Sequence, residues 1–593
     1  MNEPSFIPVL PESAPFTPEQ RGYLNGFLAG LFSRLPLNGP AVAAPAPAPL
    51  EPLTILFGSQ TGVAERLAKR IAKESGKQGF APAIYDLAKY PTAQLASERN
   101  ILLVTSTYGD GEPPDNAKSF WNLLNSPTAP RLEQTRFSVC ALGDMNYPKF
   151  CGFGKQIDAQ LDSLGAQRAY PRADCDVDYE GPFNKWLVAV FPALSERPTT
   201  ANPGVASVAT DEPEPEKPGG PSRESPGLIP LVTNRTLNGP GSGKDVRHFE
   251  FAIEGSGLVY EAGDAFGVYP CNCPALVEEM VRALHCDGEE GVPDRNGQTV
   301  TLRQALLHHY EIGKITPPIL NAFAERTGDA RLKHLASPAA NGELAKFLWG
   351  REIIDLLLAC PQAEFKLEEF IALLRKLQPR LYSISSSPKA HAGQVHLTVG
   401  IVRYESLGRA RKGVCSTFLA DRIDPSAQVP AFIHSNPAFR PPADSNAPLI
   451  MVGAGTGIAP FRAFLHERKV TGAAGKNWLF FGDQRESTDF LYRDEITPLL
   501  NQGTLNRLDT AFSRDQAEKV YVQHRMLENA SELFKWLEQG GHFCVCGDAT
   551  RMARDVDAAL HQVVERAGKR TPEQAVEYVE KLRTEKRYQR DVY

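Results

Sequence analysis

The sequence predicts a multidomain α/β + β protein: a doubly wound α/β domain, then a β-barrel with a helical insertion, then a second α/β domain. Three observations predict this order. Strand-like apolar runs alternate with helical patterns near both ends of the chain, which indicates parallel sheets covered by helices. Between Ile229 and Ile433, strand patterns surround one long helical block. Small polar residues and glycines directly follow several of the strands, where α/β sheets bind ligands.

Composition and charge exclude several classes of function. The chain has 593 residues, enough for roughly four domains, and its 42% hydrophobic share is ample for several cores. A net charge of −6 argues against nucleic acid as a partner, because nucleic-acid binding needs a basic face. No run approaches the ~20 apolar residues that span a bilayer, and no signal-peptide pattern is present. We therefore expect a cytoplasmic protein that does not bind membranes.

Residues 1–51 are predicted to hold a short helix, at about 17–33, and an Ala/Pro linker. The tract from Pro40 to Pro49 should form an extended, semi-rigid spacer. The first α/β domain follows at 52–194 and ends with a helical stretch at 183–194.

Three loops in this domain, Gly58–Gly62, Ser106–Gly111 and Leu142–Tyr147, each follow a predicted strand, at 53–57, 101–105 and 137–141. One such loop is usually only a turn, but three at the spacing of flavodoxins predict an FMN site. The helix that begins at Val63 offers its N terminus to the phosphate, and Tyr108 and Tyr147 are suited to lie flat on the flavin ring. The predicted FMN contacts are Ser59, Gln60, Thr61, Gly62, Val63, Ala64, Ser106, Thr107, Tyr108, Gly109, Leu142, Gly143, Asp144, Asn146, Tyr147, Phe150 and Cys151.

A polar segment rich in Pro, Glu and Gly at 195–226 predicts a flexible linker, which keeps two modules close while leaving their orientation free. The β-barrel domain is expected at 227–443, with the helical connecting insertion at about 275–377. Its strands are predicted at 231–236, 247–253, 265–268, 380–386, 395–403 and 428–433.

The barrel region carries the pattern of a second flavin site. Arg380-Leu-Tyr-Ser-Ile-Ser-Ser386 places an arginine suited to a pyrophosphate and a tyrosine suited to a flavin ring on one face of a strand. Gly413-Val-Cys-Ser-Thr417 begins a helix, whose N terminus favours a diphosphate. Taken alone, the tetrapeptide at Arg380 is more often an ordinary barrel strand. The two features together favour FAD.

The last domain, 444–593, has the pattern of an NADPH site. Gly453-Ala-Gly-Thr-Gly-Ile-Ala-Pro460 follows a strand at 449–452 but is not the G-x-G-x-x-G fingerprint. After the strand predicted at 505–511, cations and hydroxyls suit the 2′-phosphate that distinguishes NADPH from NADH, although two cations are also common on a solvated turn. The predicted contacts are Gly455, Thr456, Gly457, Ser513, Arg514, Lys519, Val520, Tyr521, Val522 and Gln523.

The ten cysteines form no metal-binding pattern. Two C-x-C pairs occur, Cys271/Cys273 and Cys544/Cys546, but the spacing fits neither a zinc ribbon nor an iron–sulfur motif. Most are therefore expected to be small buried side chains, Cys546 among them. No metal site is predicted, and any metal chemistry should belong to a partner.

In their order along the chain, these motifs resemble the diflavin reductase family over about 52–593, nearly the whole sequence. Within it, the chain is most similar to the flavoprotein (alpha) subunits of assimilatory NADPH-dependent sulfite reductase. That likeness depends on Asp245–His248, Gly400–Tyr404, Gly408–Arg411, Asn477–Gly482 and Arg587–Tyr593. Two features depart: Tyr108 is more like the cytochrome P-450 reductases, and the first 50 residues match only loosely.

The resemblance implies a flavodoxin-like domain, an FAD-binding β-barrel and a ferredoxin-reductase-like NADP-binding domain. It implies that Ser383, Cys546 and Asp591 surround the nicotinamide and assist hydride transfer, and that Tyr593 stacks on FAD where the nicotinamide must enter. Asp555 would lie near the nucleotide. The implied FAD contacts are Arg380, Leu381, Tyr382, Ser383, Thr398, Val399, Gly400, Tyr404, Gly413, Val414, Cys415, Ser416 and Tyr593.

The expected function is electron transfer from NADPH to FAD, to FMN and on to a partner. The resemblance implies that this partner is the sirohaem/iron–sulfur hemoprotein (beta) subunit of sulfite reductase. That enzyme reduces sulfite to sulfide for cysteine biosynthesis. Two alternatives stay open: a soluble cytochrome P-450 reductase-like flavoprotein with another acceptor, and a flavodoxin-type redox-sensing module. Self-association through the N-terminal region is also left open.

Overall fold

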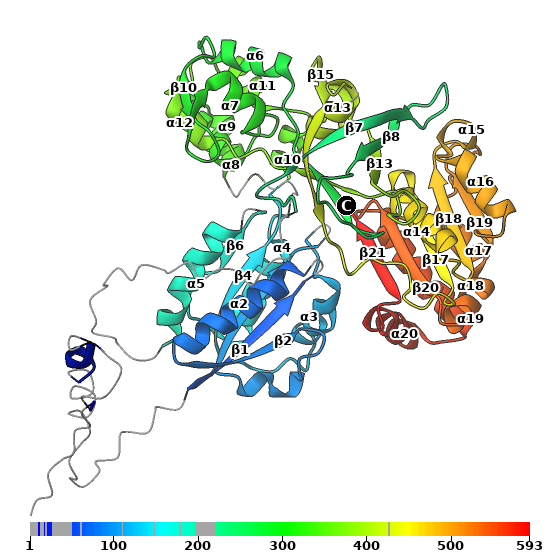
Figure 1. The fold of residues 1–593 in the computed structure, drawn as a ribbon, viewed down its shortest axis with the longest axis horizontal. Helices are drawn as coiled ribbons and strands as arrows, with labels where there is room; N and C mark the ends of the chain where they lie inside the picture. Colours follow the sequence, from blue (N-terminus) through cyan, green and yellow to red (C-terminus); the bar gives the residue numbers. More distant parts are fainter. Residues whose placement is uncertain are drawn as a thin grey trace, which may run out of the picture.

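We analysed a computed structural model of the chain. It describes residues 10–11, 17, 20–25, 50–59, 62–108, 111–145, 149–177, 179–195, 220–337, 340, 342–424 and 427–593. The predicted helix at 17–33 lies largely outside these residues, as do the Ala/Pro tract and most of the 195–226 segment. Figure 1 shows three parts of the chain arranged around the end marked C.

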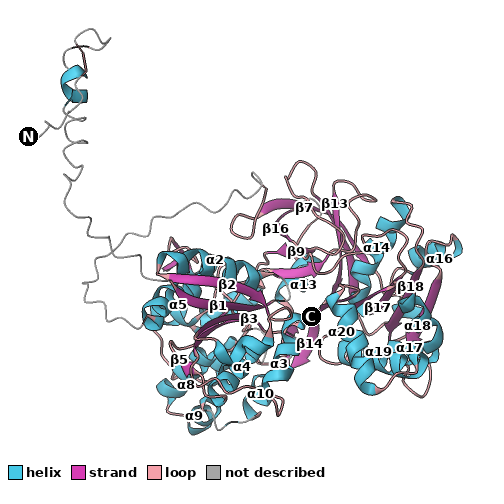
Figure 2. Ribbon diagram, turned by 90° about the horizontal axis from the view of Figure 1, so that it is seen from below, coloured by secondary structure: helices cyan, strands magenta, loops and turns pink. Residues whose placement is uncertain are grey.

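Residues 51–195 form a doubly wound α/β module, which we call the flavodoxin-like module. Its parallel strands lie in the order β2-β1-β3-β4-β5, with β6 beside β4. The strands are β1 (Glu51–Gly58), β2 (Phe80–Asp86), β3 (Asn100–Ser106), β4 (Arg136–Leu142), β5 (Gln167–Arg168) and β6 (Ala173–Cys175). The helices are α2 (Val63–Lys77), α3 (Lys118–Leu124), α4 (Gly152–Ser163) and α5 (Glu180–Leu194). Side chains of α2 and α5 pack on one face of the sheet and those of α3 and α4 on the other (Figure 2), so its central strands are buried and almost wholly apolar.

The second part is an antiparallel barrel in the order β12-β9-β16-β7-β8-β13, closed by a bridge between Ile384 and Leu397. Its strands are β7 (Gly227–Thr236), β8 (Val246–Ala252), β9 (Ala265–Val268), β12 (Arg380–Ser383), β13 (Gln394–Gly400) and β16 (Gln428–His434). The hairpin of β14 (Arg403–Ser406) and β15 (Arg409–Lys412) leads into helix α13 (Val414–Asp421). Alternate residues of the strands point inward and form one apolar core.

A helical insertion with its own apolar core separates β9 from β12. Its helices are α6 (Pro274–Ala283), α7 (Leu302–His308), α8 (Pro317–Thr327), α9 (Ala330–Ala336), α10 (Glu343–Leu348), α11 (Ile353–Ala359) and α12 (Leu367–Leu373). A short hairpin, β10 (Gly291–Pro293) and β11 (Thr299–Thr301), lies between α6 and α7. In Figure 1 the insertion lies next to the flavodoxin-like module.

The last part is a parallel sheet in the order β19-β18-β17-β20-β21, with β21 at one edge. The strands are β17 (Leu449–Ala454), β18 (Asn477–Asp483), β19 (Arg507–Phe512), β20 (His542–Gly547) and β21 (Tyr588–Val592). The helices are α14 (Ala459–Val470), α15 (Glu486–Asp489), α16 (Arg493–Asn501), α17 (Val522–Glu528), α18 (Ala530–Glu538), α19 (Met552–Gly568) and α20 (Pro572–Thr584). Among the described helices, none is both long enough and apolar enough to cross a membrane.

The observed elements differ from the predicted ones in a few places. The strand predicted at 395–403 is two strands. The N–H of Ile401 still bonds the carbonyl of Asp245 at 2.7 Å, in register with β8, but the carbonyl of Val402 accepts from the N–H of Gly413, and Arg403 pairs with Lys412 of β15. The strand predicted at 380–386 ends at Ser383, and the one predicted at 505–511 begins only at Arg507. The helical block also contains the β10–β11 hairpin, which its sequence did not signal.

Candidate functional site

The first group of predicted residues meets at one edge of the flavodoxin-like sheet. β1, β3 and β4 are neighbours, so their carboxyl ends bring Ser59, Ser106–Tyr108 and Leu142–Asp144 together. The N–H of Thr107 donates to the carbonyl of Leu142 at 2.9 Å, which joins two of the loops. Five of the predicted contacts lie outside the described residues: Gln60, Thr61, Gly109, Asn146 and Tyr147.

Close packing between the loops and the start of α4 fixes the backbone at this edge of the sheet. A Cβ on Gly143 would lie 2.8 Å from the backbone nitrogen of Cys151, so only glycine lets the two segments approach. The N–H of Phe153, in the first turn of α4, donates to Oγ1 of Thr107 at 3.3 Å. Helix α2 begins after Gly62 without a side-chain cap, which leaves its first amides for an anion. These features fit FMN, with the phosphate at α2 and the ring along the other two loops.

The second group lies along β12 and at the start of α13. Arg380 contacts Glu311 through a 3.0 Å ion pair, and Leu381 points to the opposite, exposed side. A Cβ on Gly413 would lie 2.6 Å from Oγ of Ser416 and 2.8 Å from Cβ of Val402, so this turn also requires glycine. Val414, Cys415 and Ser416 follow as the first turn of α13.

A buried hydroxyl near this group has no protein partner. Oγ1 of Thr316 accepts and donates no hydrogen bond within the described chain, although it is inaccessible to solvent. Thr316 comes after Glu311, the ion-pair partner of Arg380, in the segment that leads into α8. An unpaired buried hydroxyl and an uncapped glycine turn fit FAD. Neither Thr316 nor Glu311 was predicted, because both come from the insertion.

The remaining predicted FAD contacts are not all brought to this place. The hydroxyl of Thr398 bonds that of Tyr492 at 2.7 Å, inside the joint between the barrel and the last sheet, so its side chain is already engaged there. Val399 is buried in the barrel core. Tyr404 is half exposed on β14, with the ring of Trp349 6.3 Å away. Trp349 was not predicted, since an isolated tryptophan after a helix carries no recognisable pattern.

Three of the residues expected at the nicotinamide meet in one cluster. Oγ of Ser383 donates to Oδ2 of Asp591 at 2.6 Å, and Sγ of Cys546 lies 3.9 Å from the same oxygen. Cys546 and Asp591 are opposite one another in the register of β20 and β21. Burial raises the pKa of Asp591 above its ordinary value, although the hydrogen bonds from Ser383 and Cys546 lower it. Burial, and then the charge of Asp591, raise the pKa of the Cys546 thiol, so the thiol is protonated at neutral pH.

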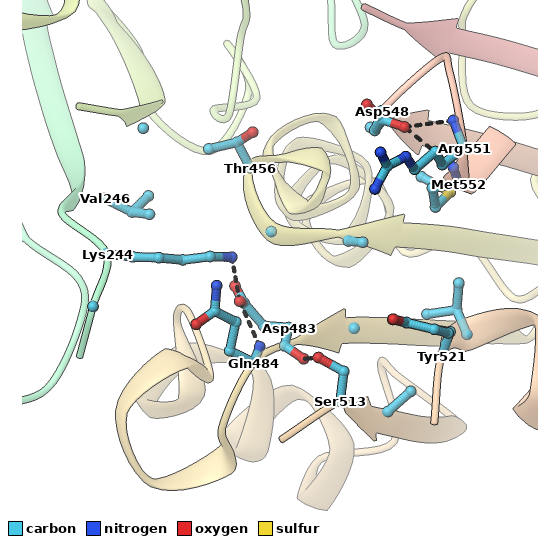
Figure 3. Close-up of a pocket in the computed structure, with 18 of the residues that line it drawn as sticks. Lys244, Val246, Thr456, Asp483, Gln484, Ser513, Tyr521, Asp548, Arg551 and Met552 are labelled. Atoms are coloured by element: carbon cyan, nitrogen blue, oxygen red, sulfur yellow. Dashed lines mark hydrogen bonds and ion pairs between the residues drawn. The ribbon is translucent and has the colours of Figure 1, made fainter. Parts of the chain in front are cut away.

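A cavity of about 1030 Å³ opens beside this cluster, between the barrel and the β17–β21 sheet (Figure 3). Tyr593 lies on its wall, and its hydroxyl is 2.7 Å from Oγ1 of Thr456. The predicted residues that line the cavity are Gly400, Gly455, Thr456, Ser513, Tyr521, Val522, Gln523, Asp555 and Tyr593. Gly457, Arg514, Lys519 and Val520 are not among its lining residues. Gly457 instead packs on β20, where a Cβ would lie 2.1 Å from the carbonyl oxygen of Cys546.

The cavity also contains charged residues that the sequence did not reveal. Lys244, from the loop between β7 and β8, reaches across to form an ion pair with Asp483 at the end of β18 (Figure 3). Burial raises the pKa of Asp483, and the charge of Lys244 lowers it. Oδ2 of Asp483 is buried without a hydrogen-bond partner in the described chain, so it remains available to a ligand. Arg551, on the opposite wall, also lines the cavity.

The sequence matches three family models: "Flavodoxin" over residues 55–186, "FAD binding domain" over 221–418 and "Oxidoreductase NAD-binding domain" over 451–558. It is 43% identical to the sulfite reductase [NADPH] flavoprotein alpha-component of Bacillus subtilis, over 99% of this chain and 96% of that protein. It is 44% identical to the protein of the same name from Vibrio cholerae, over 97% and 93% of the two chains. The chain belongs to this family of diflavin reductases.

The family confirms the predicted fold class, and its three domain types account for the three sites. The predicted FMN edge lies in the flavodoxin-like module and the predicted FAD strand in the barrel, whereas the cavity lies between the barrel and the last sheet. The Ser383–Asp591–Cys546 cluster lies where the last two modules meet. The cavity fits a dinucleotide in size, and its unpaired Asp483 oxygen and its cations suit hydroxyl and phosphate groups.

Proposed function

We propose that this chain takes electrons from NADPH and passes them through FAD and FMN to a hemoprotein partner, as the flavoprotein component of an assimilatory sulfite reductase. The observation that carries the proposal is the cluster of Ser383, Asp591 and Cys546. It lies next along the chain to Gly547 and Tyr593, which line the nucleotide cavity. It joins a residue of the FAD barrel to two residues of the nucleotide sheet.

The bound flavins supply the chemistry, namely hydride acceptance by FAD and one-electron delivery by FMN. The protein's own residues orient the reactants and exclude water. Asp591 accepts a hydrogen bond from the hydroxyl of Ser383, which fixes that hydroxyl at the surface of β12. Cys546 keeps its thiol proton and is fully buried, so the cluster presents a dry wall to the nicotinamide. Tyr593, on the wall of the cavity, would cover the path by which the nicotinamide approaches this cluster.

The predicted site residues and domain boundaries stay proposals. Ser513 and Tyr521 line the cavity and are assigned to the 2′-phosphate. Arg514 and Lys519, which lie next to them in the sequence, are proposed to approach the same phosphate. Arg551 and Lys244 are added to the predicted set as cations for the phosphates of the nucleotide. We retain the proposed boundaries at 52–194, 227–443 and 444–593.

A hemoprotein is the proposed acceptor because the curated relatives are named as the alpha-components of sulfite reductase. Glu112, Asp115 and Asp176 at the FMN edge pair with arginines of this chain, and once released from them they would suit a basic surface on such a partner. We also retain the proposals that the protein works in the cytoplasm and that it self-associates through its N-terminal region.

The purified chain should contain FMN and FAD in equal amounts, measured by acid extraction and chromatography. With NADPH it should reduce ferricyanide or cytochrome c, and it should produce sulfide from sulfite only after a sirohaem hemoprotein is added. Sulfide from the isolated chain would contradict the division of labour, and recovery of a single flavin species would contradict the two-flavin assignment.

A further inference from the structure

Carboxylates of the flavodoxin-like module meet arginines of the other modules at three places in the described chain. The ion pairs are Asp115 with Arg590, Glu112 with Arg554 at 2.7 Å, and Asp176 with Arg375. Each arginine comes from a different part of the chain: β21, α19 and the segment after α12. The module is therefore held at separated points, by charges of one sign facing charges of the other.

The contact made by Arg590 is unlike the Glu112–Arg554 contact. The side chain of Arg590 is only 6% exposed, whereas that of Arg554 is 51% exposed. The guanidinium of Arg590 also lies over the ring of Tyr108, 5.0 Å from its centroid. Arg590 thus contacts both a carboxylate and an aromatic ring of the FMN edge. Burial alone would raise the pKa of Asp115, but the charges of Arg590 and Lys118 hold it well below its usual range.

Arg590 belongs to the same short strand as the hydride-transfer cluster. In β21, successive side chains point to opposite faces, so Arg590 faces the flavodoxin-like module while Asp591 faces Ser383. The strand lies at the edge of its sheet, and only β20 is paired with it. Figure 1 shows β21 between the flavodoxin-like module and the nucleotide sheet. The position of an edge strand held on one side depends strongly on the side-chain contacts of its two faces.

We propose that Arg590 is a positioning residue through which docking of the flavodoxin-like module holds Asp591 and Tyr593 in place for hydride transfer. When Asp115 and Tyr108 are docked, β21 is held from both faces. When the module leaves to reach an acceptor, β21 loses the contacts of Arg590 with Asp115 and Tyr108, while Tyr588 on the same face stays packed in the core of its sheet. The hydride-transfer cluster then loosens. Reduction by NADPH is thereby favoured while FMN is in position to receive the electrons.

The first test uses Asp115→Asn, which removes the charge on the module side and leaves β21 unchanged in sequence. In the holoprotein without NADPH, hydrogen exchange of the peptide covering 588–593 should become faster. In single-turnover mixing with NADPH, flavin bleaching should slow on the order of tenfold, within the usual range of coupling between two sites. Glu112→Gln is the matched control, because it removes a more exposed ion pair of the same surface, made to α19 rather than to β21. A single exposed pair contributes little by itself, so this variant should change neither readout.

The second test is a double-mutant cycle with Arg590→Gln. If both residues act through their mutual contact, the double variant should be no slower than either single variant. Arg590→Lys keeps the charge and should restore bleaching to within about threefold of the wild type, which a purely structural role would not explain.

The proposal would be overturned if Asp115→Asn had wild-type rates of hydrogen exchange at 588–593 and of flavin bleaching. It would also be overturned if the effects in the double-mutant cycle were additive, or if Glu112→Gln changed both rates as much as Asp115→Asn. The inference rests on the proposed direction of electron flow, but the exchange experiment contains no NADPH. A wild-type protein that NADPH does not bleach would refute the proposed function, and exchange at 588–593 would still decide the coupling.

Discussion

At the residue scale, we propose that cations near the nucleotide cavity determine the choice between NADPH and NADH. Arg514 directly follows Ser513, a lining residue, and its guanidinium makes no hydrogen bond or ion pair within the described chain. Its backbone is fixed, because its N–H donates to the carbonyl of Gln484 at 2.8 Å. A fixed backbone with an unengaged charged side chain is suited to bind an anion at the rim.

Arg514→Ala should lower kcat/KM for NADPH by about tenfold to a hundredfold and leave kcat/KM for NADH nearly unchanged. A hydrogen bond to a charged group contributes about 1.5–3 kcal/mol, and only NADPH has the 2′-phosphate. Steady-state kinetics with both nucleotides measure the effect. Lys535→Ala, an exposed cation on α18, is the control, and equal losses with both nucleotides would show that Arg514 has a structural role.

Tyr593→Ala should relax the preference for NADPH over NADH. The ring lies on the cavity wall and is held by the bond to Thr456, so a nicotinamide must displace it. Aromatic stacking is worth about 0.5–1.5 kcal/mol beyond buried area, and binding of the 2′-phosphate offsets that cost for NADPH alone. The ratio of kcat/KM values should therefore fall severalfold. Tyr593→Phe keeps the ring and should keep the ratio, whereas an unchanged ratio in Tyr593→Ala would refute a role at the entrance.

Residue types next to strand ends could be predicted from the sequence, but partners from distant segments could not. Ser513 and Tyr521 follow a strand pattern and do line the cavity. Lys244 contacts Asp483 across 239 positions of the chain, so no local sequence pattern indicates that contact. Arg514 was predicted as a direct contact by the same reasoning as Ser513, yet it is not a lining residue.

At the element scale, β8, β13, α14 and the turn before β13 bring four histidines together at the joint between the barrel and the last sheet. Nδ1 of His248 is 2.9 Å from the hydroxyl of Tyr492, and Nε2 of His391 is 3.1 Å from Nδ1 of His466. Nδ1 of His396 accepts from Arg462 at 3.2 Å. Burial, and then the charge of Arg462, lower the pKa of His248 to about 3, of His396 to about 2 and of His466 to about 3.

These histidines should make the joint sensitive to acid. Their pKa values in the folded state lie below the ordinary 6.5, so the unfolded chain binds more protons as the pH falls from 6.5. The contribution of these histidines to the free energy of unfolding is therefore fully present above pH 6.5. It falls as the pH drops below 6.5, by up to about 1.4 kcal/mol per pH unit for each histidine. The Tm, followed by circular dichroism, should drop clearly between pH 7 and pH 5.

His466→Gln should reduce this pH dependence, because it removes one of the groups that titrate. Glutamine can keep a hydrogen bond to His391 without accepting a charge. The exposed His334 supplies the matched control, and His334→Gln should leave the slope of Tm against pH unchanged. An equal Tm at pH 5 and pH 7 in the wild type would rule out the joint as an acid-sensitive element.

Parallel strands were the elements most easily predicted, because burial on both faces makes them continuous apolar runs. The split of the predicted strand at 395–403 could not be foreseen. It depends on a distant segment: the N–H of Gly413 bonds the carbonyl of Val402 at 2.9 Å, and Arg403 pairs with Lys412 instead of with β8. The β10–β11 hairpin was not predicted, because its three-residue strands are too short to show a periodic pattern.

At the scale of the whole molecule, the apolar cores of the modules are separate. Two cores belong entirely to the flavodoxin-like module, and no residue of them lies beyond Leu194. The other described cores begin at Ile229 or later, although the barrel and the last sheet share one of them. The described ion pairs between the flavodoxin-like module and the rest are polar contacts of a kind that seldom decides folding.

A fragment of residues 220–593 should therefore fold alone, retain FAD and reduce ferricyanide with NADPH, while containing no FMN. Each part has its own core, which is the property that lets a domain fold independently. Flavin extraction and a cooperative thermal transition would check this. An insoluble fragment, or one without FAD, would show that the flavodoxin-like module is needed for folding.

The helical insertion has a consequence for how related reductases diverge. It leaves the barrel after β9 and returns at β12, and these two strands are paired, with Val268 opposite Arg380. A segment whose two ends lie side by side can be lengthened, shortened or exchanged without opening the barrel. Because Arg375, just before the return, also binds Asp176 of the flavodoxin-like module, such changes would alter the angle at which that module approaches. We expect evolutionary variation in the insertion to adjust the approach angle while flavin binding by the barrel is preserved.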